Sequence, residues 1–314
     1  MKYAGKKLVS LLMTLLFVSF LVFWAFAVIP GDPALAQLGT NATPERLEAL
    51  REEMGLNVPF LQRYMRWLLH FCKGDLGQSY SYHIPVSDMI LEKLPISLCM
   101  TGMAFVMVLL ISIPLGILSA KHRGGKLDTV ICAGNQVLMS VPPFFSGILI
   151  TLLFGMVLHW FTPGGFVSMQ QNPAGFFGYL LFPAFAIALP KAAMAVKMLR
   201  SALVTELGKD YPRTAYSRGN TRNQVLYGHV LKNAMIPVLT FFGMALSDIL
   251  TGSIIIEQVF GIPGIGRILL TSIMNRDYPV VEAIIMLMAI TVIVVNFLVD
   301  LLYRKLDPQI HVET

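Results

Sequence analysis

Charge is what this sequence lacks most. Only 13% of its 314 residues are charged, whereas 55% are hydrophobic and the mean hydropathy is +0.67. A soluble globular chain carries roughly 25% charged residues, so the shortage argues against an ordinary soluble domain and indicates a membrane protein. The net charge of +6 is then ascribed to cytoplasmic loops and not to nucleic-acid binding, since the chain has no basic and aromatic nucleic-acid motif.

Motifs for catalysis and metal binding are missing as well. The three cysteines show no Cys-x-x-Cys spacing, and the six histidines are scattered without a His-Glu-x-x-His pattern. No G-x-x-x-x-G-K-[ST] phosphate loop is present, so the chain is not an NTPase by that route. Neither a Gly-x-Ser-x-Gly elbow nor a Ser/Lys protease signature stands out. The sequence therefore predicts no catalytic residue, no metal site and no cofactor in this chain, and it argues against a membrane enzyme.

Long apolar runs are what the sequence has instead. A helix needs about 20 residues to cross a hydrocarbon core of ~30 Å. Six runs are long enough: 8–29, 96–120, 129–160, 176–199, 234–256 and 280–302. We therefore predict an all-α membrane protein with six transmembrane helices. The pair Pro142 and Pro143 predicts a kink or a break in the third run, and Pro183 and Pro190 predict distortion of the fourth.

The distribution of Lys and Arg predicts the orientation. Most of the 24 basic residues fall in segments that lie on one side if the N-terminus is inside, and most of the others lie in one long loop, where the rule has little force. Both termini and the loop 200–233 are therefore predicted to be cytoplasmic. The first apolar run is longer than the ~7–15 residues of a signal-peptide core, so we interpret 1–29 as a retained span.

The segment between the first two spans, residues 30–95, is predicted to be extracytoplasmic and helical. Thr43 and Pro44 form an N-cap and first-turn pair for a helix that ends at Gly55. Aromatic and leucine residues recur at helical spacing from Pro59 to Phe71, and Pro85 to Leu94 indicates a third short helix. Two roles remain open: a layer lying on the bilayer or capping the bundle, and a docking surface for a soluble partner.

Two loops of the transmembrane domain, residues 96–314, carry signals for short helices. Gly261 to Tyr278 predicts an extracytoplasmic turn that dips toward the bundle, followed by a short helix. In the cytoplasmic loop, Pro212 suits a first helical turn and Gly219 suits a left-handed helix end. Thr221 followed by Gln224 predicts a capping box that starts the next helix. A basic, ordered loop of this kind is predicted to dock a partner.

Ionisable residues within apolar runs are costly, at ~2.5–3.5 kcal/mol for a charge at the bilayer centre on insertion scales. Asp248 lies near the middle of the fifth run and Lys191 lies inside the fourth. They are candidates for the translocation path and for each other's partner. A purely structural hydrogen-bonding role for Asp248 is the alternative.

Several motifs together resemble the permease subunits of bacterial ABC importers of the dipeptide, oligopeptide and nickel branch. They run in order over nearly the whole chain: PGDPA at 30–34, GDLGQSY at 74–80, LPISL at 94–98, PLG at 114–116, FGIPGIGR at 260–267, RDYPV at 276–280, VDLLY at 299–303 and LDP at 306–308. The 210–240 stretch is similar to the cytoplasmic "Glu-Ala-Ala" loop of such permeases. Arg213 replaces the glutamate that names the loop, and Arg-Thr-Ala is usual in this branch.

This resemblance implies a multi-pass protein of the bacterial inner membrane that shares the translocation pathway with a second, similar permease. It also implies two cytoplasmic ATPase subunits that hold the ATP and Mg²⁺, and an extracytoplasmic substrate-binding protein. A coupling helix at about Pro212–Ser217 would sit in a groove of an ATPase subunit. The implied coupling residues are Asp210, Tyr211, Pro212, Arg213, Thr214, Ala215, Arg218 and Gly219.

The substrate stays open between peptides and nickel or other metal chelates. The stretch Thr251 to Gly266 is more similar to peptide permeases, whereas the acidic Asp248 would suit a cationic substrate. A function of another class, an ion-coupled secondary transporter, would have to rely on Asp248 and Lys191 alone, and the chain shows no internal repeat of the kind that such transporters often have.

Overall fold

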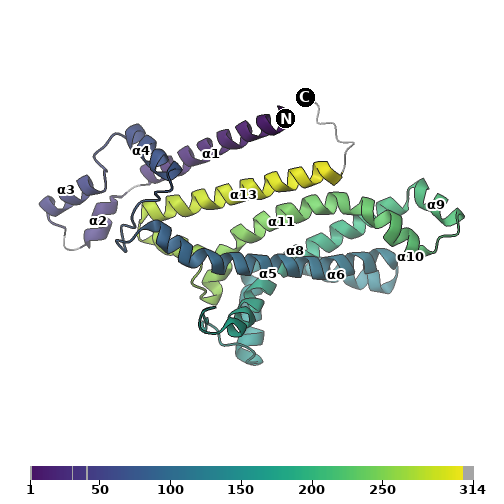
Figure 1. Cartoon of the computed structure of the whole chain (residues 1–314). Coiled ribbons are helices and arrows are strands. Elements are labelled where there is room, and N and C mark those ends of the chain that lie inside the picture. Colours follow the sequence, from purple (N-terminus) through teal and green to yellow (C-terminus); the bar gives the residue numbers. More distant parts are fainter. Residues whose placement is uncertain (1, 30, 40–41, 307–314) are drawn as a thin grey trace. The chain divides into compact units, whose positions relative to one another are not determined.

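The computed structural model describes residues 2–29, 31–39 and 42–306, and these residues are mainly helical (Figure 1). Within those ranges, β-type pairing is confined to an isolated bridge between Gln78 and Pro85. The chain forms two compact units. The first combines Met1–Ile96 with Pro263–Ile293, and the second combines Ser97–Ile262 with Val294–Thr314.

The first unit contains the N-terminal helices and the turn before the last helix. Its helices are α1 (Lys2–Val28), α2 (Pro33–Leu38), α3 (Pro44–Glu53), α4 (Phe60–Cys72), α12 (Ile265–Met274), and the first parts of α5 (Val86–Lys121) and α13 (Tyr278–Leu306). The predicted turn and short helix after Gly261 are confirmed by α12. The predicted helix over Pro59 to Phe71 is confirmed by α4, within one residue at each end.

Aromatic rings join α4 to α1. Phe20 and Phe23 of α1 lie against Phe60 and Tyr64 of α4, with ring centroids 5.5 to 5.9 Å apart. The hydroxyl groups of Ser19 and Tyr64 share a hydrogen bond of 2.8 Å. The aromatic spacing of the sequence therefore marks the face of α4 that packs on α1.

One prediction for the segment 30–95 is confirmed and another is wrong. Thr43 caps α3 by accepting a hydrogen bond from the Arg46 amide, and the helix is followed by Gly55 at φ +66°. The separate third helix at Pro85–Leu94 does not exist, because α5 runs unbroken from Val86 to Lys121. Pro95 removes a single bond, the one to the carbonyl of Leu91. Leu91 is 66% exposed, so the loss does not end the helix.

The second unit contains the rest of α5 and the helices that follow it. These are α6 (Lys126–Ser140), α7 (Pro143–Ile150), the π-helix η2 (Thr151–Val157), α8 (Pro173–Leu207), α9 (Asp210–Ser217), α10 (Arg222–Val225), the π-helix η3 (Leu226–Val230), α11 (Leu231–Phe260) and the end of α13. Helices α8 and α11 run side by side, with α9 and α10 at one end of the pair (Figure 1).

The predicted kink or break at Pro142 and Pro143 is confirmed as a break in the third apolar run. It separates α6 from the α7–η2 helix, and the two axes meet at 102°. The run is therefore a broken span or a re-entrant loop and not one straight crossing. In α8, by contrast, the helix continues through Pro183 and Pro190, which are both buried, so the predicted distortion does not interrupt it.

Small side chains line the face of α8 that is buried. Ala184, Ala188, Ala192 and Ala195 are at most 1% exposed, and small residues let membrane helices approach closely. Gly116 of α5 shows how close the approach is, because a Cβ atom there would lie 2.9 Å from the Leu199 side chain. Packing of this kind needs little polar surface, which explains the low charge of the sequence.

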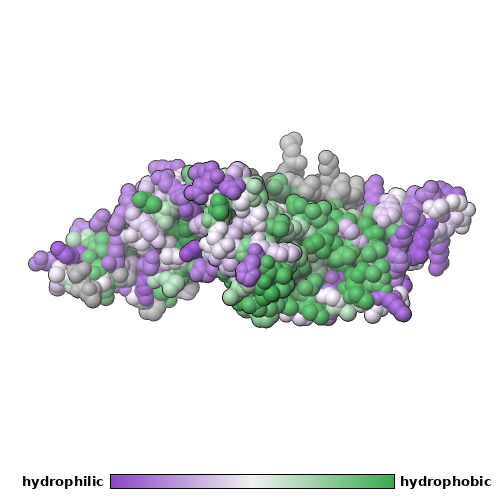
Figure 2. Space-filling model, turned by 90° about the horizontal axis from the view of Figure 1, so that it is seen from below, coloured by the Kyte–Doolittle hydropathy of each residue, from purple (hydrophilic) through white to green (hydrophobic). Residues whose placement is uncertain are grey.

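Among the described residues, five helices are long and apolar enough to cross a membrane, and the bent α6–α7 pair makes up to six. They coincide with most of each of the six apolar runs of the sequence. In Figure 2, hydrophobic side chains gather over the middle of the second unit, while hydrophilic ones cover its α9–α10 end. The polar loop thus protrudes from an apolar body, as a loop outside the bilayer would.

Candidate functional site

Helix α9 is the ordered part of the polar loop, and its C-terminus is a Schellman motif. Its last residue is Ser217, and Arg218 is the C-cap. Gly219 follows at φ +87°, which confirms the predicted left-handed position. The Gly219 amide donates to the Tyr216 carbonyl and the Asn220 amide donates to the Ala215 carbonyl, the two bonds that define this motif.

Helix α9 starts slightly before the predicted coupling helix at about Pro212–Ser217. It begins at Asp210 with Lys209 as its N-cap, so Pro212 is its third residue and lies in the first turn, as predicted. Proline is also tolerated there, because the amide groups of the whole first turn have no partner within the helix. The predicted capping box is confirmed: Thr221 and Gln224 bond each other's backbone amides and start α10. Both ends of the turn between α9 and α10 are thus fixed by local hydrogen bonds.

The residues of α9 divide into a buried and an exposed face. Pro212 and Ala215 are buried. The exposed face and the turn after it carry Asp210, Arg213, Thr214, Tyr216, Ser217, Arg218 and Gly219. The Arg213 guanidinium lies 3.6 Å from the Asp210 carboxylate, with both side chains well exposed. Such a pair contributes little to stability, so Arg213 remains available to a partner.

Side-chain contacts tie the loop to the membrane helices. The Tyr211 hydroxyl donates to the Glu206 carboxylate of α8 at 2.8 Å. Burial raises the pKa of the Tyr211 phenol, and the phenol therefore stays a donor at neutral pH. After the turn, Arg222 donates to the carbonyl of Lys121, the last residue of α5. A force on α9 would therefore reach both α5 and α8.

A buried ion pair that the sequence analysis missed joins α6 to α8. The Asp128 carboxylate is 5% exposed and accepts two bonds of 2.6 Å from Arg200, one to each oxygen. It also accepts bonds from the Ser119 hydroxyl and the Gly124 amide. Asp128 therefore fixes three segments of the second unit together near the polar loop.

The fold brings the side chains of Lys191 and Asp248 together, a contact that the sequence alone could not establish. The Lys191 Nζ atom lies 2.6 Å from an Asp248 carboxylate oxygen, and the pair links α8 to α11. Lys191 is 20% exposed and Asp248 is 60% exposed on its side chain. The pair compensates both charges, and it leaves one edge of the carboxylate open.

We expect Asp248→Asn to lower uptake several-fold, because it leaves the Lys191 ammonium in an apolar helix pair without a counter-charge. The double variant Asp248→Asn/Lys191→Met is expected to be more stable than the single variant, since no charge remains. Uptake by the reconstituted transporter and thermal stability of the purified subunit measure the two effects. Unchanged uptake with lowered stability would assign the pair a structural role alone.

Two further residues were absent from the predicted site. Tyr216 is 41% exposed on α9, on the same side as Arg213 three residues earlier, and exposed tyrosine and arginine are common hot spots of interfaces. That spacing was a signal in the sequence. Glu257 of α11 is fully buried and accepts a 2.5 Å bond from Ser97. Only the folded structure reveals that contact.

These features are typical of one class of protein, the membrane-spanning subunit of a transporter. They are the long apolar helices, an ion pair between two of them and a capped polar helix in the loop. The chain belongs to the family of binding-protein-dependent transport system inner membrane components. The model of that family matches residues 112–312, and the model of its N-terminal region matches residues 1–101. The protein is a permease subunit of an ABC importer.

Relatives match the chain from end to end. The oligopeptide transport system permease protein AppB of Bacillus subtilis is 34% identical over 94% of this chain and 95% of its own length. The glutathione transport system permease protein GsiC of Escherichia coli O6:H1 is 34% identical over 99% of both chains. Both names describe the permease part of a transport system.

Solved structures give the same fold. A chain of the MetNI methionine ABC transporter in inward-facing conformations aligns with a TM-score of 0.58, covering 70% of this chain and 96% of its own length at 18% identity. An amino acid ABC transporter aligns with a TM-score of 0.55 at 16% identity. At these identities the likeness concerns the fold alone.

Proposed function

We propose that this permease forms half of the translocation pathway of an importer for short peptides, and that α9 is its coupling helix. The observation that carries the proposal is α9 itself. It is a short polar helix between two long apolar ones, closed by the Schellman motif at Gly219 and the Thr221 capping box. A rigid helix in that position can transmit motion from a cytoplasmic partner, whereas a flexible tether cannot.

The docking surface would be the exposed face of α9. Arg213, Tyr216 and Arg218 offer two cations and an aromatic ring to an acidic groove. The other predicted coupling residues support this face: Pro212 and Ala215 pack beneath it, Tyr211 bonds Glu206, and the Thr214 hydroxyl bonds the Asp210 carbonyl. Gly219 fixes the end of the helix.

The proposed topology has six spans, with the bent α6–α7 pair as one of them. Both termini and the loop 200–233 lie in the cytoplasm. The proposed division is an N-terminal span (1–29), an extracytoplasmic helical segment (30–95) and the importer transmembrane domain (96–314). The distribution of Lys and Arg and the hydrophilic α9–α10 end of the second unit support this orientation.

The proposed assembly contains a second homologous permease, two ATPase subunits that bind ATP and Mg²⁺, and an extracytoplasmic substrate-binding protein. It lies in the inner membrane of a bacterium. The description of the family as a binding-protein-dependent inner membrane component supports both the binding protein and the membrane.

A peptide substrate is favoured over a nickel or other metal chelate. Asp248 was the feature that suited a cationic substrate, and Lys191 neutralises it at 2.6 Å. The names of the relatives AppB and GsiC support a peptide. Ion coupling through Asp248 and Lys191, the secondary-transporter alternative, is disfavoured by the family of the chain.

Co-purification tests the coupling proposal. The tagged full chain, co-expressed with its partner subunits, is expected to retain both ATPase subunits and to import di- and tripeptides when ATP is supplied. Replacing both Arg213 and Tyr216 by alanine is expected to release the ATPase subunits, whereas Lys126→Ala at the exposed start of α6 is not. Uptake that needs no ATPase subunit and collapses with the proton gradient would contradict the proposal.

A further inference from the structure

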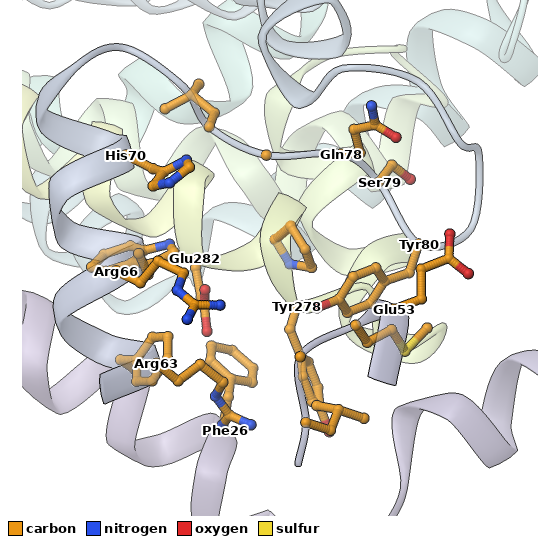
Figure 3. A pocket seen from close by; sticks show the side chains of 18 of the residues that line it. Phe26, Glu53, Arg63, Arg66, His70, Gln78, Ser79, Tyr80, Tyr278 and Glu282 are labelled. Carbon is orange, nitrogen blue, oxygen red and sulfur yellow. The ribbon is translucent and has the colours of Figure 1, made fainter. Parts of the chain in front are cut away.

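A cavity of about 470 Å³ lies within the first unit (Figure 3). Its walls come from α1, α2, α3 and the loop after it, α4, the start of α13 and the loop before α5. Small-molecule sites commonly enclose 300–1,000 Å³, so the cavity is large enough for a ligand of a few residues. All its lining residues belong to the first unit, whereas α9 and the Lys191–Asp248 pair belong to the second.

Three buried polar groups of this cavity accept no hydrogen bond from the described residues. Glu282 is only 6% exposed, and its charged neighbour is the Arg63 guanidinium. The Tyr278 hydroxyl and the Gln37 Oε1 atom are fully buried and unpartnered over the same residues. Buried polar groups nearly always have a hydrogen-bond partner, so these groups make the cavity a candidate site for a polar ligand.

The three groups belong to elements that meet at the cavity. Tyr278 and Glu282 are four residues apart on α13 and therefore share a face. The Nε2 atom of Gln37 donates to the Tyr80 carbonyl, which leaves its oxygen unused. Burial and the neighbouring Glu282 raise the pKa of the Tyr80 phenol, so it stays neutral at the cavity wall. This side of the cavity presents one carboxylate and several neutral oxygen atoms.

The α4 side of the cavity offers the opposite charge. Arg63 and Arg66 project from α4 (Figure 3). The Arg63 guanidinium is held 5.2 Å over the ring of Phe23, whereas Arg66 is exposed. Trp67 and Phe26 add apolar walls. The cavity therefore combines an acceptor-rich acidic side, a guanidinium side and aromatic surface between them.

We propose that this cavity binds a short zwitterion, an amino acid or dipeptide, outside the translocation pathway. The three N–H donors of its ammonium group match Glu282, Gln37 Oε1 and the Tyr278 hydroxyl. Its carboxylate pairs with Arg66, for which guanidinium geometry is well suited. The proposal rests on the proposed function, since a peptide importer meets such ligands on its extracytoplasmic face. The permease itself would thus sense the substrate there.

Calorimetry on the full chain in lipid nanodiscs, without the binding protein, tests the site. The probes are Ala-Ala, N-acetyl-Ala-Ala and Ala-Ala-amide. We expect Ala-Ala to bind, and both blocked dipeptides to bind at least about tenfold more weakly because each loses one charge pair. Glu282→Gln is expected to weaken Ala-Ala binding about tenfold while changing the binding of N-acetyl-Ala-Ala less than about twofold. Glu45→Gln, an exposed change on α3, is the matched control.

The variant Tyr278→Phe distinguishes loss of ligand binding from loss of folding. It removes an unpartnered buried hydroxyl, and it is therefore expected to keep or raise the thermal stability while weakening Ala-Ala binding several-fold. Equal binding of Ala-Ala and N-acetyl-Ala-Ala, or binding that ignores both Glu282→Gln and Tyr278→Phe, would overturn the site. Absence of Ala-Ala binding would also overturn it. If Ala-Ala does not bind but the complete assembly still imports peptides, the proposed function stands without the site. Failure of uptake by the complete assembly would contradict the proposed function itself.

Discussion

Replacing Arg200 by methionine is expected to destabilise the subunit by about 3 kcal/mol, because it leaves the Asp128 carboxylate buried and unpaired. That carboxylate is 5% exposed and accepts two bonds, each 2.6 Å long, from Arg200, which is its only cationic partner among the described residues. The remaining bonds from Ser119 and Gly124 do not supply a positive charge. Thermal unfolding of the purified subunit in detergent measures the loss.

Two comparison variants make the Arg200 experiment specific. Lys209→Met removes the cation from a more exposed pair with Glu206 and is expected to cost less than about 1 kcal/mol. The double variant Arg200→Met/Asp128→Asn removes both charges, and it should be more stable than Arg200→Met alone. If the double variant were less stable than the single one, desolvation of the lone carboxylate would not be the cause of the destabilisation.

The parts of the fold that follow from local sequence could be predicted. Apolar runs of about 20 residues predict spans because hydrocarbon forces the backbone to bond within the helix. The C-terminus of α9 was predictable for a similar reason: Gly219 and the Thr221–Gln224 pair act within a few residues of themselves. Lys191 and Asp248 could be paired as a hypothesis, since each is costly in an apolar helix without the other.

Contacts between distant residues could not be predicted. Arg200 and Asp128 are 72 positions apart, and Asp277 reaches 198 positions back to bond Ser79. Nothing in the local sequence marks either carboxylate as buried, because both lie at helix ends, where exposed acids are common. The same limit applies to Glu282, whose cavity exists only once α1, α4 and α13 have packed around it.

Helix continuity was also beyond local reasoning. A separate short helix was expected at Pro85–Leu94, and Pro183 and Pro190 predicted distortion, yet α5 and α8 continue through these prolines and Pro95, while Pro142 and Pro143 produce a bend of 102°. A single proline removes one hydrogen bond, and packing decides whether the helix can absorb the loss. The start of α9 at Asp210 follows the same rule, since Pro212 fits any position of a first turn.

The coupling role of α9 predicts that Gly219→Val impairs both transport and substrate-stimulated ATP hydrolysis. Gly219 sits at φ +87°, where an L-residue costs about 1–2 kcal/mol and a β-branched residue costs more. No neighbouring atom lies within 4 Å of the added Cβ, so the strain comes from the backbone alone. Valine is expected to unwind the Schellman motif and to lower peptide uptake and substrate-stimulated ATPase activity about tenfold, since about 1.4 kcal/mol is a factor of ten.

Gly228→Val is the matched control, because its Cβ also meets open space but its backbone is not left-handed. We expect that variant to keep both activities. The Gly219 variant should still insert in the membrane and unfold at a similar temperature, since the turn lies outside the packed helices. Uptake assays in proteoliposomes measure transport, and ATPase rates in the same vesicles measure substrate-stimulated hydrolysis. Normal uptake in Gly219→Val would mean that the partner does not require the fixed end of α9, and the coupling helix would have to be sought elsewhere in the loop 200–233.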